Sequence, residues 1–579
     1  DQWDDSRFTT FVQLRKGVPA AAVAAKIADH LRGKPTTEKD ARLDLQSLSE
    51  MYRHPGLAGE PFPQGDIRYV RIFALAALFI LLIACANFMN LTTARSANRA
   101  REVGLRKVFG ARRGQLVWQF YSECLILTAI AFLLAILAAG FFLGPFNALA
   151  AKELSLGLFG DPSTLAVLVG LVLLTGFLAG SYPALFLSNF WPARVLRGNR
   201  AAGSRGQGFR KALVVFQFSV TGLLLICTLF LRGQLNYMKR FDAGYDKEQV
   251  LTVSLSDELR PNYEALRAEI LRDPDVLGVT ASANIPTRGW LYSNTLWKWN
   301  GKNPQEEILI RGTCADVGFF GLLGVEILQG RDFIPTEKID DTQWIINEEA
   351  ARVMGFKDPI GQSLVQGGDV FGKIVGVVKN YNITVLRDKI DPLVIGYYPP
   401  LNRFLLAKIR PGKTREALRY IETVWKKFAP DDEFRYSFLD EAAEALYRSE
   451  ERTGAILRDF SILAVLVACL GLFGLASFMA EQRTREIGIR KVLGASTARI
   501  VCLFSREFAQ WVVAANAIAW PLAYYFVRQW LRGYAYRIAL GPGPFLFAAA
   551  LALLVALATV SYHLVRAARQ DPAQTLKYE

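Results

Sequence analysis

Histidine and cysteine are scarce in this chain, and neither forms a pattern that would hold a metal. The 579 residues include three histidines, His30, His54 and His563, which lie far apart in the sequence. The six cysteines show no CxxC pair, and all but Cys314 lie in or beside apolar segments. We therefore expect no metal site, no disulfide framework and no histidine-based catalytic cluster.

A phosphate-binding loop is also missing. The nearest match is PGKT at 411–414, but a P-loop needs a glycine five positions before that of the GK pair, where Ala407 stands. The acids Asp332, Glu348 and Asp358 have no spacing that brings them together, so turn capping or a solvated surface is favoured over acid–base catalysis. The sequence does not predict an enzyme, and no cofactor is expected to bind directly.

Long apolar segments dominate what the sequence does contain. Hydrophobic residues make up 52% of the chain and are gathered in blocks. A bilayer core of about 30 Å needs about 20 mostly apolar residues in a helix. Seven segments meet this requirement, near 72–92, 116–142, 162–187, 212–231, 459–480, 500–528 and 544–565. The sequence predicts a polytopic α-helical membrane protein with seven visible spans.

The positive charge of the chain follows the ends of these segments. A net charge of +15 is compatible with a nucleic-acid surface, but much of the excess lies in short loops beside the spans. Residues 93–116 hold seven lysines and arginines and one acid, Glu102. Such loops mark the cytoplasmic side of a membrane, which also places the C-terminus in the cytoplasm and residues 1–70 outside. We expect no nucleic-acid partner.

The chain contains an internal repeat. REVGLRKVFGA at 101–111 returns as REIGIRKVLGA at 485–495, an offset of 384 positions. Further matches lie outside this motif: Gly17 with Gly412, Tyr52 with Tyr447, and 192–197 with 572–577. Residues 11–197 and 406–577 therefore look like two copies of one unit. By the offset of 395 that relates Gly17 to Gly412 and Tyr52 to Tyr447, the first copy would lack about 185 residues and one span, so we expect eight spans in the intact chain.

Within the repeated motif, apolar residues fall on one face of a helix. Leu105, Val108 and Phe109 are spaced i, i+3, i+4, and Gly110 can end the helix. Such a helix could insert its apolar ridge into a groove of a partner, or it could only lie at the membrane interface with its basic side chains among lipid headgroups. The near-identity of the two copies favours a shared docking task.

The candidate docking residues are those of the motif in both copies. They are Arg101, Glu102, Gly104, Leu105, Arg106, Lys107, Val108, Phe109 and Gly110, with Arg485, Glu486, Gly488, Ile489, Arg490, Lys491, Val492, Leu493 and Gly494.

These motifs, each placed after one span and before two more, resemble the FtsX-like permease domain. The segment between the copies resembles the periplasmic core domain of macrolide-exporter-type permeases. The matching stretches are GYDKEQVLTVSL (244–255), GVEILQGRDF (324–333), IINEEAARVMG (345–355), DPIGQSL (358–364) and KIVGVVKNYN (373–382).

The resemblance implies a type VII ABC system in the bacterial inner membrane that works by mechanotransmission. The implied function is export or extraction of a hydrophobic or peptide-like substrate from the periplasmic side. The alternative is a non-transporting scaffold that regulates a periplasmic hydrolase or a sensor kinase. The implied partners are membrane lipid, a periplasmic adaptor or hydrolase, and a cytoplasmic ATPase dimer. That dimer would bind ATP and Mg and would contact 101–110 and 485–494.

The resemblance also suggests a domain plan. Mixed β-rich and helical runs predict α+β core domains of one or two lobes. The expected domains are 1–70, the C-terminal part of a first periplasmic core domain; 71–198, a first permease domain with three visible spans; 199–234, a cytoplasmic linker and fourth span; 235–455, a second core domain; and 456–579, a second permease domain with three spans.

Overall fold

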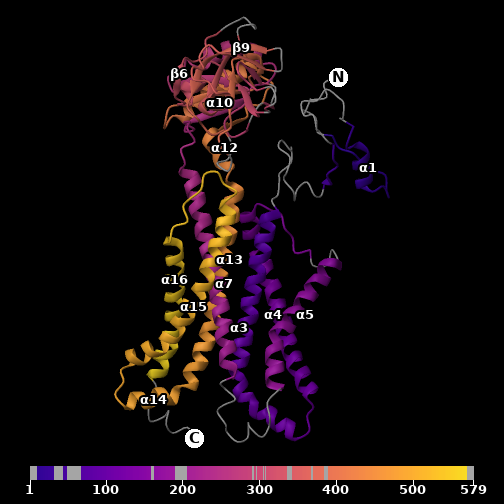
Figure 1. The fold of residues 1–579 in the computed structure, drawn as a ribbon, viewed down its shortest axis with the longest axis vertical. Coiled ribbons are helices and arrows are strands. Elements are labelled where there is room, and N and C mark those ends of the chain that lie inside the picture. Colours follow the sequence, from indigo (N-terminus) through magenta and orange to yellow (C-terminus); the bar gives the residue numbers. More distant parts are fainter. Residues whose placement is uncertain are drawn as a thin grey trace. The chain divides into compact units, whose positions relative to one another are not determined.

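The computed structural model divides into two compact units, which are described separately here (Figure 1). The helical unit comprises Ile67–Asn236, Ser449–Arg532 and Ile538–Glu579, and the mixed unit comprises Asp1–Asp66, Tyr237–Arg448 and Gly533–Arg537. The residues that the structure describes are 10–30, 43–48, 67–157, 162–188, 205–289, 292–294, 297–303, 306, 308–335, 342–366, 370–383 and 389–569.

Long helices build the helical unit. They are α3 (Ile67–Val108), α4 (Arg113–Ala150), α5 (Pro162–Ser188), α7 (Arg205–Arg240), α13 (Arg448–Gln482), α14 (Thr484–Val492), α15 (Thr497–Leu531) and α16 (Gly543–Ala568). Among the described residues, six helices are long and apolar enough to cross a membrane: α3, α4, α5, α7, α13 and α16. Six of the seven predicted spans are thus confirmed by length and composition.

The remaining predicted span, 500–528, forms helix α15 but is not among those six. It is long enough, with 35 residues, but Gln510, Asn516 and Pro521 make its middle more polar. Asn516 is satisfied within the helix, because its Nδ2 donates to the Val512 carbonyl at 2.8 Å and its Oδ1 accepts from the Trp520 indole at 3.1 Å. Local pairing of this kind lowers the cost of polar groups at membrane depth.

Helix α4 shows that the helical unit needs an apolar surrounding. None of the residues in its most apolar window is buried in the structure, and Leu133, Leu137 and Phe141 are 62–78% exposed. An apolar surface of this extent is not stable in water. The bilayer is the medium that covers it, so the chain is a membrane protein.

The two copies of the repeated motif differ in how their helix begins. In the first copy α3 continues without a break to Val108, so the separate helix expected at 101–110 is the end of α3. In the second copy α13 ends at Gln482 and α14 begins at Thr484. The Thr484 hydroxyl donates to the Ala480 carbonyl at 2.9 Å, a contact that bends helices, whereas the first copy has Ala100 there.

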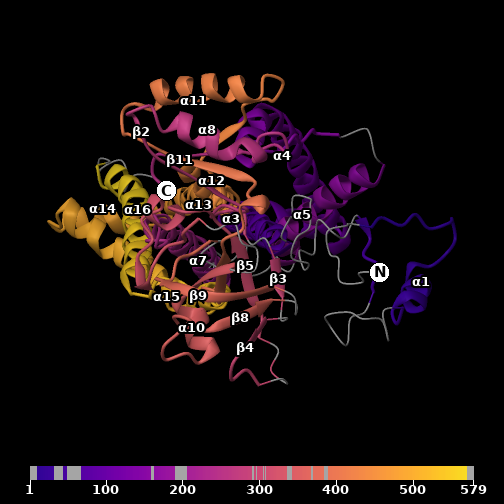
Figure 2. The same ribbon diagram turned by 90° about the horizontal axis from the view of Figure 1, so that it is seen from above.

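The mixed unit contains two sheets together with helices, in agreement with the predicted α+β fold. The first has four antiparallel strands in the order β12-β1-β11-β2. Their bounds are β1 (Val250–Ser254), β2 (Val276–Ser282), β11 (Phe404–Ile409) and β12 (Tyr436–Phe438). Helices α8 (Tyr263–Ile270) and α11 (Thr414–Phe428) lie side by side next to β2 and β11 (Figure 2) and share one apolar core with this sheet. The chain order β-α-β-β-α-β is that of a split βαβ fold.

The second sheet is inserted between β2 and β11. Its order is β3-β5-β10-β7-β9-β8-β4, with β6 paired to β9, and it is mixed because β5–β10 and β7–β9 are parallel. The strands are β3 (Tyr292–Asn294), β4 (Trp297–Trp299), β5 (Ile310–Cys314), β6 (Ile327–Gly330), β7 (Thr342–Asn347), β8 (Ser363–Gln366), β9 (Val370–Val378) and β10 (Leu393–Gly396). The other helices of the mixed unit are α1 (Ala20–Ile27), η2 (Arg260–Asn262), α9 (Phe319–Leu322), α10 (Glu348–Met354), η3 (Pro399–Leu401) and α12 (Leu439–Ala445).

The repeat extends outside the spans in one described place. Gly17 and Gly412 both have positive φ, +89° and +81°, and each lies in a turn just before a helix, α1 and α11. The Val18 N–H donates to the Arg15 carbonyl, and the Lys413 N–H donates to the equivalent Arg410 carbonyl, both at 3.1 Å. The PGKT string is therefore this tight turn. Tyr52 and the predicted tail matches at 192–197 and 572–577 lie outside the described residues.

Candidate functional site

The two copies of the repeated motif end in the same backbone geometry. Gly110 has φ +93°, and its N–H donates to the Lys107 carbonyl at 3.1 Å. The next N–H, of Ala111, donates to the Arg106 carbonyl at 3.0 Å. The second copy repeats both bonds at 3.0 and 2.9 Å, with Gly494 (φ +88°) in the place of Gly110. This is a Schellman motif, which favours glycine at the left-handed position, so the prediction that these glycines end the helices is confirmed.

One residue in each copy anchors the helix end to the rest of the helical unit. Val103 is 3% exposed and packs in a cluster with Leu116, Phe120 and Ala184. Ile487, 2% exposed, takes its place in the second copy. Its cluster includes Ile500 and Phe504, which are equivalent to Leu116 and Phe120 at the offset of 384. It also includes Leu564, which is equivalent to Ala184 at the offset of 380 that relates 192–197 to 572–577. Both helix ends are therefore held by the same internal contacts.

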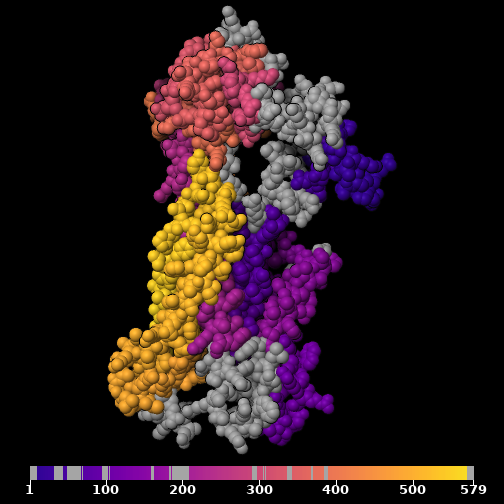
Figure 3. Space-filling view, in the orientation of Figure 1, coloured from indigo at the N-terminus to yellow at the C-terminus, as the bar shows by residue number. Residues whose placement is uncertain are grey.

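The apolar residues predicted to form a ridge are exposed in both copies. The first ridge is Leu105, Val108 and Phe109, with exposed fractions of 49%, 60% and 86%, and the second ridge is Ile489, Val492 and Leu493, with 46%, 64% and 79%. Figure 1 places α14 at the lower end of the bundle, and Figure 3 shows the orange segment that contains it on the outer surface. Large apolar side chains that remain exposed beside charged ones mark contact surfaces.

The charges beside the two ridges are also repeated. Glu102 and Arg106 form an ion pair of 2.7 Å one helical turn apart, and Glu486 and Arg490 form the same pair at 2.7 Å. Burial lowers the pKa of the Lys107 ammonium below its usual range, and the charge of Arg113 lowers it further. Arg101, Gly104 and Arg485 lie in the helices, but their surroundings are outside the described part of the structure, and Gly488 is buried.

Glu507, which the sequence did not single out, forms ion pairs that connect α7 and α15 to the start of the second motif. Glu507 of α15 accepts from Lys211 of α7 at 3.3 Å and from Arg483, between α13 and α14, at 3.2 Å. The Arg483 guanidinium also lies 5.0 Å from the centroid of the Phe504 ring, a cation–π distance. The sequence did hold one indication, because Glu507 stands at the repeat offset of 384 from Glu123.

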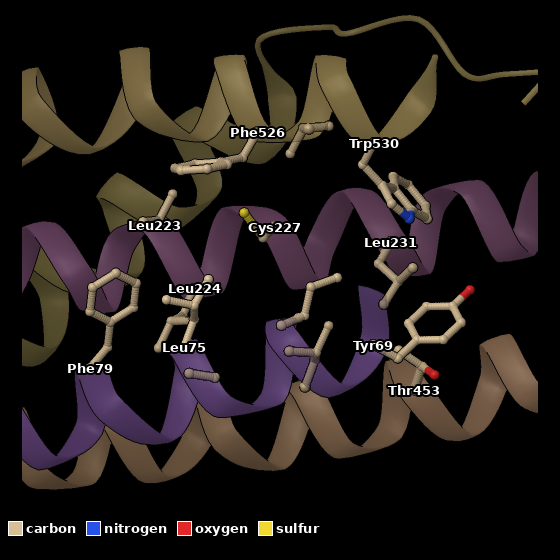
Figure 4. Close-up of a pocket in the computed structure, with 14 residues that line it drawn as sticks. Tyr69, Leu75, Phe79, Leu223, Leu224, Cys227, Leu231, Thr453, Phe526 and Trp530 are labelled. Atoms are coloured by element: carbon tan, nitrogen blue, oxygen red, sulfur yellow. The ribbon is translucent and has the colours of Figure 1, made fainter. Parts of the chain in front are cut away.

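The helical unit also holds an apolar cavity of about 200 Å³, which the sequence did not predict. Residues of α3, α7, α13 and α15 line it, and Tyr69, Thr453 and Trp530 lie together at one end of it while Phe79, Leu75 and Leu224 lie at the other (Figure 4). Its lining is apolar apart from that end. A cavity with these properties fits a hydrocarbon group better than a charged one.

Two of the three acids considered for catalysis, Asp332 and Glu348, serve as local hydrogen-bond acceptors. Asp332 accepts from the backbone N–H groups of Gly318 and Phe333, at 3.1 and 2.8 Å. Glu348 accepts from the Asn380 N–H at 2.9 Å. These contacts are those of turn and loop capping, the interpretation that the sequence favoured.

Among the described residues, six apolar helices, a mixed α+β unit and a duplicated helix end define a membrane protein built from two repeats. The FtsX-like permease C-terminal family model matches the chain twice, at residues 74–192 and 460–572. The chain therefore contains two FtsX-like permease domains, one in each sequence repeat, which confirms the predicted family and the predicted duplication.

Curated relatives are similar to parts of the chain. The macrolide export ATP-binding/permease protein MacB of Bdellovibrio bacteriovorus is 32% identical over 127 residues, which is 22% of this chain and 19% of that protein. The MacB protein of Psychrobacter arcticus is 24% identical over 219 residues, 36% of this chain and 32% of that protein. The chain thus spans a third or less of the length of these relatives.

A solved structure is also similar to part of the chain. The periplasmic region of MacB from Actinobacillus actinomycetemcomitans matches 35% of this chain and 94% of its own, with 12% identity and a TM-score of 0.25.

Proposed function

We propose that this chain is the permease subunit of an ATP-driven mechanotransmission ABC system and that the two ridges dock a separate cytoplasmic ATPase dimer. The observation that carries the proposal is the equivalence of the ridges, whose apolar side chains are 46–86% exposed in both copies. Two equivalent surfaces suit a partner with two equivalent subunits. A helix end with an apolar face is also the element that protein grooves commonly bind.

Each ridge is rigidly connected to membrane helices, as transmission of movement requires. The first ridge is the end of α3, which is continuous with a predicted span, so a push on the ridge moves that span directly. The second ridge lies on the shorter α14. It is fixed to its neighbours by Ile487 and by the Arg483–Glu507 pair. Both connections would carry closure of an ATPase dimer into the bilayer.

The proposed substrate is hydrophobic or peptide-like, exported or extracted from the periplasmic side of the inner membrane. The apolar cavity among α3, α7, α13 and α15 supports an apolar substrate class. The basic loops beside the spans support a cytoplasmic side that includes the C-terminus, and the exposed face of α4 supports contact with membrane lipid. A periplasmic adaptor is a further proposed partner.

The test is co-purification of this chain with candidate ABC ATPases from the same cell, followed by ATP hydrolysis in reconstituted vesicles. Phe109→Ser combined with Leu493→Ser removes the two most exposed ridge side chains and should abolish ATPase binding while the permease stays folded. Leu277→Ser is the matched control, because Leu277 is also exposed (54%) but lies in the mixed unit. Wild-type binding by the ridge variant would overturn the docking assignment.

The same preparation separates transport from signalling. A hydrophobic or peptide-like substrate that stimulates ATP hydrolysis and is released from the membrane would support transport. A bound ATPase that drives no release, together with crosslinking to a periplasmic hydrolase or a sensor kinase, would support the scaffold alternative instead.

A further inference from the structure

The two permease repeats meet within the helical unit along α3 and α13. Residues 83–91 (IACANFMNL) and 467–475 (VACLGLFGL) align at the offset of 384 without a gap. Three aligned pairs are identical, so the equivalent positions of the two helices are unambiguous. These pairs are Ala84 with Ala468, Cys85 with Cys469, and Leu91 with Leu475. Buried residues of both helices belong to one apolar cluster, which includes Ile83 and Ala464.

At the centre of this contact, Asn87 lies against Gly471, which is its own repeat equivalent. A Cβ atom on Gly471 would overlap the amide of Asn87. Two equivalent positions can face each other only where a twofold axis relates the two copies. Asn87 and Gly471 therefore lie at the local pseudo-twofold axis of the repeats.

The Asn87 amide uses the room that the glycine leaves. Asn87 is 8% exposed, and its Nδ2 donates to the Val467 carbonyl of α13 at 2.5 Å. The next carbonyl of α13, that of Ala468, accepts from the amide of Gln217 in α7 at 2.8 Å. Hydrogen bonds from side-chain amides to a neighbouring helix stabilise a particular pairing of helices at membrane depth.

A second glycine of α13, about one turn further along, also faces a larger side chain of α3. The Leu91 side chain lies against Gly474, where a Cβ atom would overlap it. The repeat equivalent of Gly474 is Asn90, which is 1% exposed. At both positions the second repeat supplies a glycine and the first repeat supplies an asparagine. The two backbones are thus related by symmetry, but their contacting side chains are not.

We infer that the Asn87–Gly471 pair makes the two repeats complementary to each other and incompatible with copies of themselves. Two asparagines at the axis would place two amides in the space that holds one. Two glycines would leave a void and lose the bond to Val467. The partner surface for α3 is therefore the second repeat of this chain, and pairing of like repeats between two chains is disfavoured.

Side-chain exchange across the axis tests this inference in the full chain. Gly471→Asn should reduce the folded, monodisperse fraction in detergent about tenfold, because overpacking a core is costly, and Asn87→Gly should reduce it less. The double variant Asn87→Gly/Gly471→Asn should recover most of the loss. Its introduced amide can donate to the Ile83 carbonyl, the equivalent of Val467.

Milder variants keep the test informative if Gly471→Asn does not fold at all. Gly471→Ala should lower the thermal midpoint. Gly170→Ala is its matched control on α5, where nothing lies within 4 Å of an added Cβ, and should leave the midpoint unchanged or slightly raised. The inference is overturned if the double variant is no better than Gly471→Asn, or if Gly471→Ala behaves like Gly170→Ala.

Discussion

Val103 and Ile487 are buried at equivalent positions of the two permease repeats, each two residues before the exposed side chain that begins a ridge. Their exposed fractions are 3% and 2%, whereas those of Leu105 and Ile489 are 49% and 46%. One face of each helix end therefore holds the protein together, and the adjacent face is left open. Stability and partner binding should be separable by mutation within a single turn.

Truncation of the anchor should destabilise the protein, whereas truncation of the ridge should not. Ile487→Ala should lower the free energy of unfolding by about 2–5 kcal/mol, since it opens a cavity in a packed cluster. Val492→Ala, at a residue that is 64% exposed, should change it by less than about 0.5 kcal/mol. Reversible unfolding in mixed micelles measures both. Equal losses for the two variants would contradict the assignment of the two faces.

The left-handed glycines that end the motif helices should resist substitution for a backbone reason alone. An added Cβ on Gly110 or Gly494 meets nothing within 4 Å, but both residues have φ near +90°. Gly110→Ala and Gly494→Ala should each cost about 1 kcal/mol, because an L-residue is strained there. Thermal midpoints measure this cost.

The control for the glycine prediction is Gly114→Ala. Gly114 also has open space around it, but it lies in α4 and lacks a positive φ. Alanine should therefore be neutral or slightly stabilising there, because it favours helix. A loss at Gly114 as large as that at Gly110 would show that the left-handed backbone conformation does not set the cost.

The parts of the site that depend on local pattern could be predicted from the sequence. Spacing at i, i+3, i+4 predicted the ridge, and glycine predicted the helix end, because both features are set within one turn. Glu507 could not be placed, since its partners Lys211 and Arg483 are brought together only by the packing of three helices. The pairing of Asn87 with Gly471 has the same origin.

For the fold as well, features set by local sequence could be predicted, and features set by contacts distant in sequence could not. Apolar segments of about 20 residues predicted the long helices, and the repeat predicted two equivalent permease domains. The break between α13 and α14 was not predicted for one copy alone, because the sequence does not show which of several differences matters; the Thr484 hydroxyl, which bonds back to the Ala480 carbonyl where the first copy has Ala100, is evident only in the structure. The strand order of the mixed unit depends on contacts distant in sequence, and no local pattern contains it.

Removal of the Glu507 charge should weaken the connection behind the second ridge. Glu507→Gln leaves Lys211 and Arg483 without the carboxylate that both contact. Because that carboxylate is only 25% exposed, we expect a loss of about 1 kcal/mol in the free energy of unfolding, smaller at high salt.

A surface pair supplies the comparison for Glu507. Glu422 and Lys426 form an exposed pair of 2.6 Å within one helix, and Glu422→Gln should cost less than about 0.5 kcal/mol. If Glu507→Gln costs no more than this, the charge cluster does not hold α14 in place, and transmission through α14 would depend on Ile487 alone.

Asp332 should make the stability of the mixed unit depend on pH. Burial raises the pKa of the Asp332 carboxyl above its usual range, although the N–H groups of Phe333 and Gly318 donate to it. The folded state therefore binds more protons than the unfolded chain, whose aspartates titrate near about 3.9. Stability from this group is highest below that pH and falls as the pH rises through the folded pKa.

Asp332→Asn isolates this contribution, because the amide does not titrate in the same range. The stability of the wild type relative to the variant should decrease as the pH is raised from about 4, measured by thermal unfolding of both proteins in the same detergent buffers. A relative stability that is constant or increases with pH would mean that the two N–H donors outweigh burial and hold the carboxylate ionised.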